Sequence, residues 1–263
     1  MEGDLSTRLA APGPVVGNWL SLDSPTIAEV YAELGTDFVL VDTEHTPLSL
    51  ETIAECVRAV DAAGTETNAV VRVPDANPTT IKRVLDLGVD GLMVPMVETP
   101  AGASAVVEAT RYPPAGLRGV GVGRANRYGL EIEETLETAG DRLATIVQIE
   151  TGEGVENAAA IAAVDGIDSL FVGPADLSTS LGSFADWTDE RFEESIDRVI
   201  GAAHDADVPV GTLAIGDEQL ERWAGYGFDY VIVGYDVGYL IEGSRRARES
   251  YLSAVDRGEP GER

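Results

Sequence analysis

Residues 168–182 read DSLFVGPADLSTSLG and contain the clearest strand signal in the chain. The run from Ser169 to Val172 is short and apolar without alternation, which is typical of a parallel strand covered on both faces. The run ends in a Gly-Pro turn followed by Asp176, so a buried strand delivers a carboxylate to its carboxyl end. We therefore expect a parallel α/β sheet with polar residues gathered at one edge.

Seven further segments of this kind occur along the chain, separated by amphipathic helical segments. Residues 24–35 (SPTIAEVYAELG) and 77–88 (NPTTIKRVLDLG) each begin with a capping residue and a proline and end at a glycine, as helices do. Eight alternating strands and helices in 263 residues predict a (β/α)₈ TIM barrel, with a doubly wound open sheet as the alternative. The predicted strands are 14–20, 37–45, 68–74, 91–98, 143–150, 169–176, 208–214 and 230–236.

No composition break divides the chain, so we expect a single barrel domain over residues 1–263. Its last helix, at about 238–256, is long and polar on one side. The loop 111–129 (RYPPAGLRGVGVGRANRYG) is the longest interruption of the pattern, and long ordered loops are commonly functional. Its glycines do not form a dinucleotide-binding turn, because Arg124 stands where the third glycine of G-x-G-x-x-G belongs.

The chain is strongly acidic, with 46 Asp and Glu against 18 Lys and Arg and a formal net charge of −28. Phosphate backbones and anionic membranes would be repelled, which argues against nucleic-acid and membrane partners. An acidic surface with a single lysine, Lys82, suggests a halophilic protein. No secretory signal and no apolar segment of the roughly 18 residues that a span requires are visible, so we expect a cytoplasmic protein.

Polar residues follow several predicted strands, whose carboxyl ends share one rim of a barrel. Glu150 and Asp176 end adjacent strands, and two neighbouring carboxylates repel each other unless one holds a proton or a cation lies between them. A hard divalent cation with oxygen ligands, such as Mg²⁺ or Mn²⁺, would resolve this conflict. The alternative is that each acid caps the helix that follows it.

Basic side chains at the same rim suggest further roles. Arg72 suits a substrate carboxylate in a bidentate arrangement, or a structural ion pair with one of the acids. His45 beside acidic residues can carry protons near neutral pH. The only lysine, Lys82, falls inside a predicted helix, which argues against a lysine imine. Carbanion chemistry on a carbonyl compound would then need a metal as Lewis acid.

Several long motifs occur in order: VDTEHTP (41–47), VRVP (71–74), LMVPMVET (92–99), RYPPAGLRGVG (111–121), RANRYG (124–129), VQIETGEGVEN (147–157) and VGPADLSTSLG (172–182). With them, the chain resembles the HpcH/HpaI family of metal-dependent 2-oxo acid aldolases, related to the citrate lyase β subunit, from residue 17 to residue 236. The resemblance implies a (β/α)₈ barrel that cleaves 4-hydroxy-2-oxo acids into pyruvate or hydroxypyruvate and an aldehyde. Such a protein is a carbon–carbon lyase.

The resemblance also implies roles for individual residues. Glu150 and Asp176 would bind Mg²⁺ or Mn²⁺, with Co²⁺ as a further possibility, and Gln148 would lie beside the metal. Arg72 would bind the 2-oxo acid and stabilise its enolate. His45, with Asp86 from a neighbouring subunit, would transfer protons. The remaining substrate-binding positions are the backbone N–H groups of Ala175 and Asp176, Arg124 facing the aldehyde, and the pocket-wall residues Trp19 and Leu213, for which apolar packing is an equal interpretation.

Family members form hexamers, as trimers of dimers, that exchange the last helix, so we expect a homo-oligomer. The chain departs from the most similar aldolases by about one residue in the glycine-rich loop before Arg124, which leaves the aldehyde open. The alternatives are an acyl-CoA lyase of the citryl- or malyl-CoA type, which the acidic charge disfavours, and a non-catalytic binder of 2-oxo acids.

Overall fold

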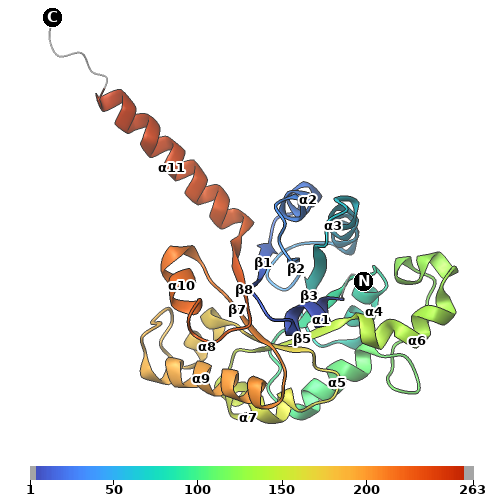
Figure 1. Ribbon diagram of the computed structural model, residues 1–263. Helices are drawn as coiled ribbons and strands as arrows, with labels where there is room; N and C mark the ends of the chain where they lie inside the picture. The colour runs from blue at the N-terminus through green and yellow to red at the C-terminus, as the bar shows by residue number, and fades with distance from the viewer. Residues whose placement is uncertain (1–3, 258–263) are drawn as a thin grey trace, which may run out of the picture.

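The computed structural model describes residues 4–257 and confirms the predicted (β/α)₈ barrel. Eight parallel strands pair in sequence order, and β8 pairs with β1 to close the cylinder (Figure 1). The strands are β1 (Val15–Leu20), β2 (Phe38–Asp42), β3 (Asn68–Arg72), β4 (Gly91–Val94), β5 (Ala144–Ile149), β6 (Ser169–Val172), β7 (Val210–Leu213) and β8 (Tyr230–Tyr235).

A helix follows every strand, and three further helices are added to the basic pattern. The helix after each strand, in order, is α2 (Pro25–Glu33), α3 (Leu50–Ala62), α4 (Pro78–Leu85), α5 (Pro100–Thr110), α7 (Gly152–Ala162), α9 (Glu190–Asp205), α10 (Gly216–Trp223) and α11 (Asp236–Arg257). The additions are α1 (Leu5–Ala10) before β1, α6 (Ile132–Arg142) before β5 and α8 (Pro174–Ser180) after β6. The predicted loop 111–129 contains a 3₁₀ segment, η1 (Arg124–Gly129). No helix of the described chain is long and apolar enough to cross a membrane.

Seven of the eight strands end before the predicted residue, and three of them end three or four residues early, each for a local reason. The second ends at Asp42 rather than residue 45, because the Asp42 carboxylate accepts the N–H of Glu44 and turns the chain. The fourth ends at Val94, because Met96 adopts a left-handed backbone with φ +54°. The sixth ends at Val172, because Pro174 starts α8 and places Asp176 in a helical turn.

Two apolar layers hold the barrel together. Inside it, apolar side chains from α1, β1–β6 and β8 fill the cylinder, and the rings of Phe38 and Tyr230 meet edge to face with centroids 5.9 Å apart. Gly17 and Gly211 make room for them, because a Cβ would lie 2.3 Å from the Phe38 ring or 2.2 Å from the Tyr230 ring. A second, larger layer lies between the strands and the helices.

Every even-numbered strand begins with the same device, which we call the aspartate clamp. A left-handed glycine ends the preceding turn, and an aspartate follows two residues later. The aspartate carboxylate accepts, at 2.7–2.8 Å, the backbone N–H of a residue in the preceding odd-numbered strand, and its own N–H donates to the carbonyl of that same residue. The four pairs are Gly35 with Asp37, Gly88 with Asp90, Gly166 with Asp168 and Gly227 with Asp229.

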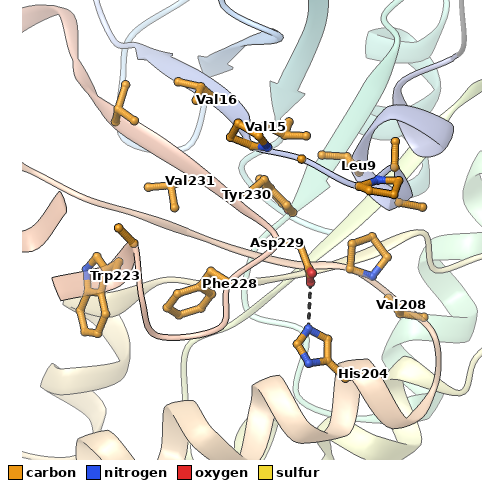
Figure 2. A pocket seen from close by; sticks show the side chains of 18 of the residues that line it. Leu9, Val15, Val16, His204, Val208, Trp223, Phe228, Asp229, Tyr230 and Val231 are labelled. Carbon is orange, nitrogen blue, oxygen red and sulfur yellow. Dashed lines mark hydrogen bonds and ion pairs between the residues drawn. The ribbon is translucent and has the colours of Figure 1, made fainter. Parts of the chain in front are cut away.

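The last helix leaves the barrel instead of packing against it. Figure 1 shows α11 projecting outward from the end of β8. As a result, alternate residues of β8, among them Val231, stay partly exposed, whereas nearly all residues of the other strands are buried. A cavity of about 800 Å³ lies along β1 and β8 beside α9 and α10, and among its lining residues His204 Nε2 lies 3.1 Å from Asp229 Oδ2 (Figure 2).

Candidate active site

Glu150 and Asp176 meet the rim at the carboxyl ends of two paired strands. Ile149 of β5 is in register with Val172 of β6, so both acids leave the sheet on the same side. Glu150 is buried, whereas Asp176 is exposed in the first turn of α8. The pKa of Glu150 is raised to about 7, mainly by burial and in smaller part by the nearby carboxylates of Asp176 and Glu44.

The Glu150 carboxylate is held by two donors in a tight space. The backbone N–H of Met96 donates to Oε1 at 2.7 Å, and Nε2 of Gln148 donates to Oε2 at 3.2 Å. Gly173 provides the space behind Oε2, because a Cβ at that position would lie only 2.6 Å from this oxygen. The buried Oε1 of Gln148 has no partner in the described part of the chain.

Arg72 lies at the end of β3 and pairs with two acids from the end of β2. Its Nε donates to Asp42 Oδ1 at 2.8 Å, and its Nη1 lies 2.7 Å from Glu44 Oε2. The guanidinium carbon stacks 4.5 Å from the centroid of the Trp19 ring. Arg72 is thus fixed on three sides, and the structural ion pairs considered from the sequence are present.

His45 and Glu44 extend this cluster toward solvent. The His45 side chain is 68% exposed, and its Nε2 lies 3.8 Å from Glu44 Oε2. Burial raises the pKa of Glu44 and outweighs the attraction of Arg72 and His45. Glu44 therefore connects the buried arginine to an exposed histidine.

The residues at this rim fit a divalent cation. Glu150, Asp176 and Glu44 place carboxylates near one another at this rim, and their mutual repulsion adds to the effect of burial in raising the pKa of Glu150. Carboxylate and amide oxygens are the donors that Mg²⁺ and Mn²⁺ prefer. Within residues 4–257, no group of three or more His, Cys, Asp or Glu side chains is arranged as a metal site. The rim thus suits an ion that keeps most of its positions for water and substrate.

Two predicted site residues do not lie with this cluster within the chain. Asp86 ends α4, and its Oδ1 accepts a hydrogen bond from Arg118 Nη2 at 3.1 Å. Arg124 donates to the carbonyls of Leu87 and Gly88 and forms an ion pair with Asp61. These partners lead into β4, at the opposite end of the strands. Roles for Asp86 and Arg124 in the same site would require a neighbouring subunit.

The other predicted positions lie at the rim or within the barrel. Ala175 is in the first turn of α8, where backbone N–H groups have no partner inside the helix. Leu213 ends β7 and packs on the apolar cluster inside the barrel, to which Trp19 belongs.

Sequence reasoning assigned no role to four residues that shape the site. Asp42 and Glu44 are two positions apart in the motif VDTEHTP at the end of β2. This spacing lets both carboxylates form ion pairs with Arg72. Gly173 was visible only as part of a turn. Met96 gave no sequence signal, because methionine does not favour the left-handed backbone that aims its N–H at Glu150.

Comparisons with known proteins agree with this geometry. The model of the HpcH/HpaI aldolase/citrate lyase family matches residues 16–243. A hydroxypyruvate/pyruvate aldolase of Delftia acidovorans is 40% identical over 254 residues, covering 95% of this chain and 93% of that protein. A 4-hydroxy-2-oxovalerate aldolase of Novosphingobium aromaticivorans is 43% identical over 246 residues, covering 90% and 92%.

A crystal structure of an HpcH/HpaI aldolase/citrate lyase family protein from Burkholderia cenocepacia has the same fold. It is 38% identical in sequence and superposes with a TM-score of 0.91, covering 94% of this chain and 98% of that one. The chain therefore belongs to the HpcH/HpaI aldolase/citrate lyase family and is a carbon–carbon lyase.

Proposed function

We propose that the protein is a divalent-metal-dependent aldolase that reversibly cleaves 4-hydroxy-2-oxo acids into pyruvate or hydroxypyruvate and an aldehyde. The observation that carries the proposal is the placement of buried Glu150 and exposed Asp176 just beyond the carboxyl ends of paired strands, at the same rim as a fixed Arg72. The names of the relatives, hydroxypyruvate/pyruvate aldolase and 4-hydroxy-2-oxovalerate aldolase, support a 2-oxo acid substrate.

Glu150 and Asp176 would hold Mg²⁺ or Mn²⁺, or Co²⁺, with Gln148 beside it. When bound, such a cation polarises the keto oxygen of a 2-oxo acid and stabilises the negative charge that develops there. The Oε1 of Gln148, which has no partner in the described chain, supplies a further oxygen directed to this region.

Arg72 binds the oxygen of the substrate that becomes negative. Asp42, Glu44 and Trp19 hold the guanidinium in place, so it needs little reorganisation when charge develops. Among the described residues Nη2 has no partner, which leaves one edge of the fork for the substrate. The N–H groups of Ala175 and Asp176, at the start of α8, bind the substrate carboxylate.

His45 moves the proton. In cleavage it takes the proton of the C4 hydroxyl, directly or through one water, the C3–C4 bond breaks, and the aldehyde leaves. The bonding electrons remain on the pyruvate fragment as an enolate, which is then protonated at C3. The closeness of His45 to Glu44, and the exposure of its ring, support this role. Asp86 from a neighbouring subunit would orient His45.

The assembly that we propose is a hexamer, a trimer of dimers, in which α11 is exchanged between partners. The projecting helix and the uncovered face of β8 support it. The exit angle of α11 is fixed, because Asp236 accepts the N–H groups of Ser21 and Leu22 and Tyr239 donates to Asn18 at 2.7 Å. α11 therefore cannot readily fold back onto its own barrel.

We further propose that the protein works in the cytoplasm of a salt-adapted cell. The excess of acidic over basic residues supports this, since carboxylate-rich surfaces remain hydrated and mutually screened at high salt.

The test is a retro-aldol screen over a small panel of 4-hydroxy-2-oxo acids, with released pyruvate measured by lactate dehydrogenase. Chelation with EDTA should stop turnover, and Mn²⁺ or Mg²⁺ should restore it. Full activity after rigorous chelation would remove the metal from the reaction. Cleavage of malyl-CoA but of no member of the panel would favour the acyl-CoA lyase instead.

A further inference from the structure

Met96 adopts a backbone conformation that methionine rarely takes, and it does so at the site. Its φ of +54° lies in the left-handed region, where the Cβ of an L-residue crowds the backbone. Such residues persist only where the surrounding structure holds them, and they cluster at functional sites. Met96 is also 53% exposed, although Pro95 and Val97 on either side of it are buried.

The segment around Met96 is anchored on both the end of β5 and α7. The N–H of Val97 donates to the carbonyl of Gln148 at 3.2 Å. The side chain of Glu98 accepts the hydroxyl of Thr151 at 2.9 Å, and its carbonyl accepts the side-chain amide of Asn157 at 2.8 Å. These contacts hold the chain just after Met96, so the strained conformation cannot relax without breaking them.

The left-handed turn sends the amide of Met96 inward and its side chain outward. The N–H reaches Oε1 of Glu150 at 2.7 Å, the short distance of a hydrogen bond to a charged acceptor. Gln148 takes one position on the other oxygen at 3.2 Å. A carboxylate has about four acceptor positions. One on each oxygen is thus occupied, and one on each remains.

We propose that Met96 is a positioning residue for Glu150. The strained backbone of Met96 fixes the rotation of the Glu150 carboxylate through the amide N–H of Met96. The free acceptor positions of the carboxylate then face the mouth of the barrel. This inference rests on the proposed function, in which Glu150 binds the cation. The methionine side chain plays no part in it. The backbone supplies the interaction, so the residue type should matter less than the N–H group.

Replacing Met96 with its α-hydroxy analogue, by genetic code expansion in the full-length chain, changes one N–H into an ester oxygen and leaves the side chain intact. We expect Mn²⁺ affinity, measured by electron paramagnetic resonance titration, to fall by about 10–100-fold, as is usual when a partner of a metal ligand is lost. Met96→Ala is the matched control, because it keeps the N–H and the left-handed strain, and its affinity should stay within about twofold of the parent. An ester variant that binds Mn²⁺ as tightly as the parent, or an alanine variant as weak as the ester, would overturn the proposal.

A second measurement needs no metal. The chain contains three methionines, so [¹⁵N]methionine labelling gives a simple spectrum in which Met93, buried in β4, is the internal control. In the metal-free protein, Glu150→Gln should shift the amide signal of Met96 and leave that of Met93 in place. An unmoved Met96 signal would refute the contact. Unchanged Mn²⁺ affinity in Glu150→Gln would instead refute the proposed metal site and leave the Met96 contact to be decided by the spectrum.

Discussion

Gly173→Ala tests how closely the position of Glu150 governs the reaction. The added Cβ would lie 2.6 Å from Glu150 Oε2, whereas ordinary van der Waals contact begins at 3.4 Å. The carboxylate must therefore retreat by about 0.8 Å, or the turn before α8 must move. Gly173 has φ −84°, which alanine adopts without strain, so the effect comes from the contacts of the new Cβ with Glu150 and its neighbour Gln148.

A displacement of about 1 Å in a reacting group can cost about 100-fold in rate, equivalent to about 2.7 kcal/mol of transition-state stabilisation. We expect a loss of this size in kcat/KM for retro-aldol cleavage, measured by coupling pyruvate release to lactate dehydrogenase. Mn²⁺ affinity should fall in parallel. The thermal midpoint should change little, because alanine adopts the backbone angles of Gly173 and only one methyl group is added.

Gly152→Ala is the matched control. Gly152 follows Glu150 by two residues, yet a Cβ there meets no atom within 4 Å. Its kcat/KM should match that of the parent. If folded Gly173→Ala retained activity within about threefold of the parent, the reasoning that ties catalysis to the placement of Glu150 would be refuted.

Four further predictions follow from the charges at the rim and on the surface. Because the pKa of Glu150 is raised to about 7, the metal-free protein holds a proton on Glu150 at pH 6, and Mn²⁺ binding at that pH should release this proton. Calorimetry in buffers of different ionisation enthalpy measures the proton release. A binding heat that does not depend on the buffer would contradict the prediction. The same raised pKa means that the metal-free fold loses stability as pH rises through 7, and Glu150→Gln should flatten that dependence of the melting temperature. Arg72→Ala should slow both retro-aldol cleavage and deuterium exchange of the pyruvate methyl group by at least about 100-fold. Circular dichroism should confirm that the variant folds, because buried Asp42 loses its ion-pair partner. Retained exchange would exclude a role of Arg72 in stabilising the enolate. With a net charge of −28, the melting temperature should rise between 0.1 M and 2 M KCl, by about 2–4 °C for each kcal/mol of repulsion screened, and an unchanged value would remove the case for salt adaptation.

The fold was readable from the sequence because barrel strands leave a strong local signal. Runs such as Leu170–Val172 are apolar on both faces, and the helices between strands carry capping residues and terminal glycines, as at Asn77 and Gly88. The ends of strands were less accurate, because an Asx turn at Asp42 and a left-handed Met96 depend on contacts made later in the chain or in three dimensions.

The site was partly readable for the same reason. Arg72 ends β3, Glu150 follows β5 and Asp176 lies in the first helical turn after β6, and the barrel topology alone brings such positions to one rim. The pairing of Arg72 with two acids of β2, instead of with Glu150, depends on which neighbouring side chain is within reach, and composition does not determine that. Asp86 and Arg124 came only from family resemblance, and one chain does not bring them to the rim.

The aspartate clamps also escaped sequence reading, although the pattern is present four times. The motif is only three residues long, Gly-x-Asp before an apolar run, so a single copy carries no clear sequence signal. Its structural role becomes evident from the backbone hydrogen bond that each of the four aspartates accepts. Two of the clamp aspartates also contact a basic side chain: Asp37 pairs with Arg8, and Asp229 pairs with His204.

Four copies of the aspartate clamp lie at the amino-terminal end of the barrel, and each one joins a different pair of neighbouring strands. Damage to one clamp should loosen one pair of neighbouring strands and leave the other three pairs closed. Substitutions at the opposite rim, where bonds are made and broken, can then accumulate without undoing the clamps. The residues that stabilise the barrel at the amino ends of its strands are thus separate from the residues that react at the carboxyl ends. Substrate specificity can therefore change without a change in the scaffold.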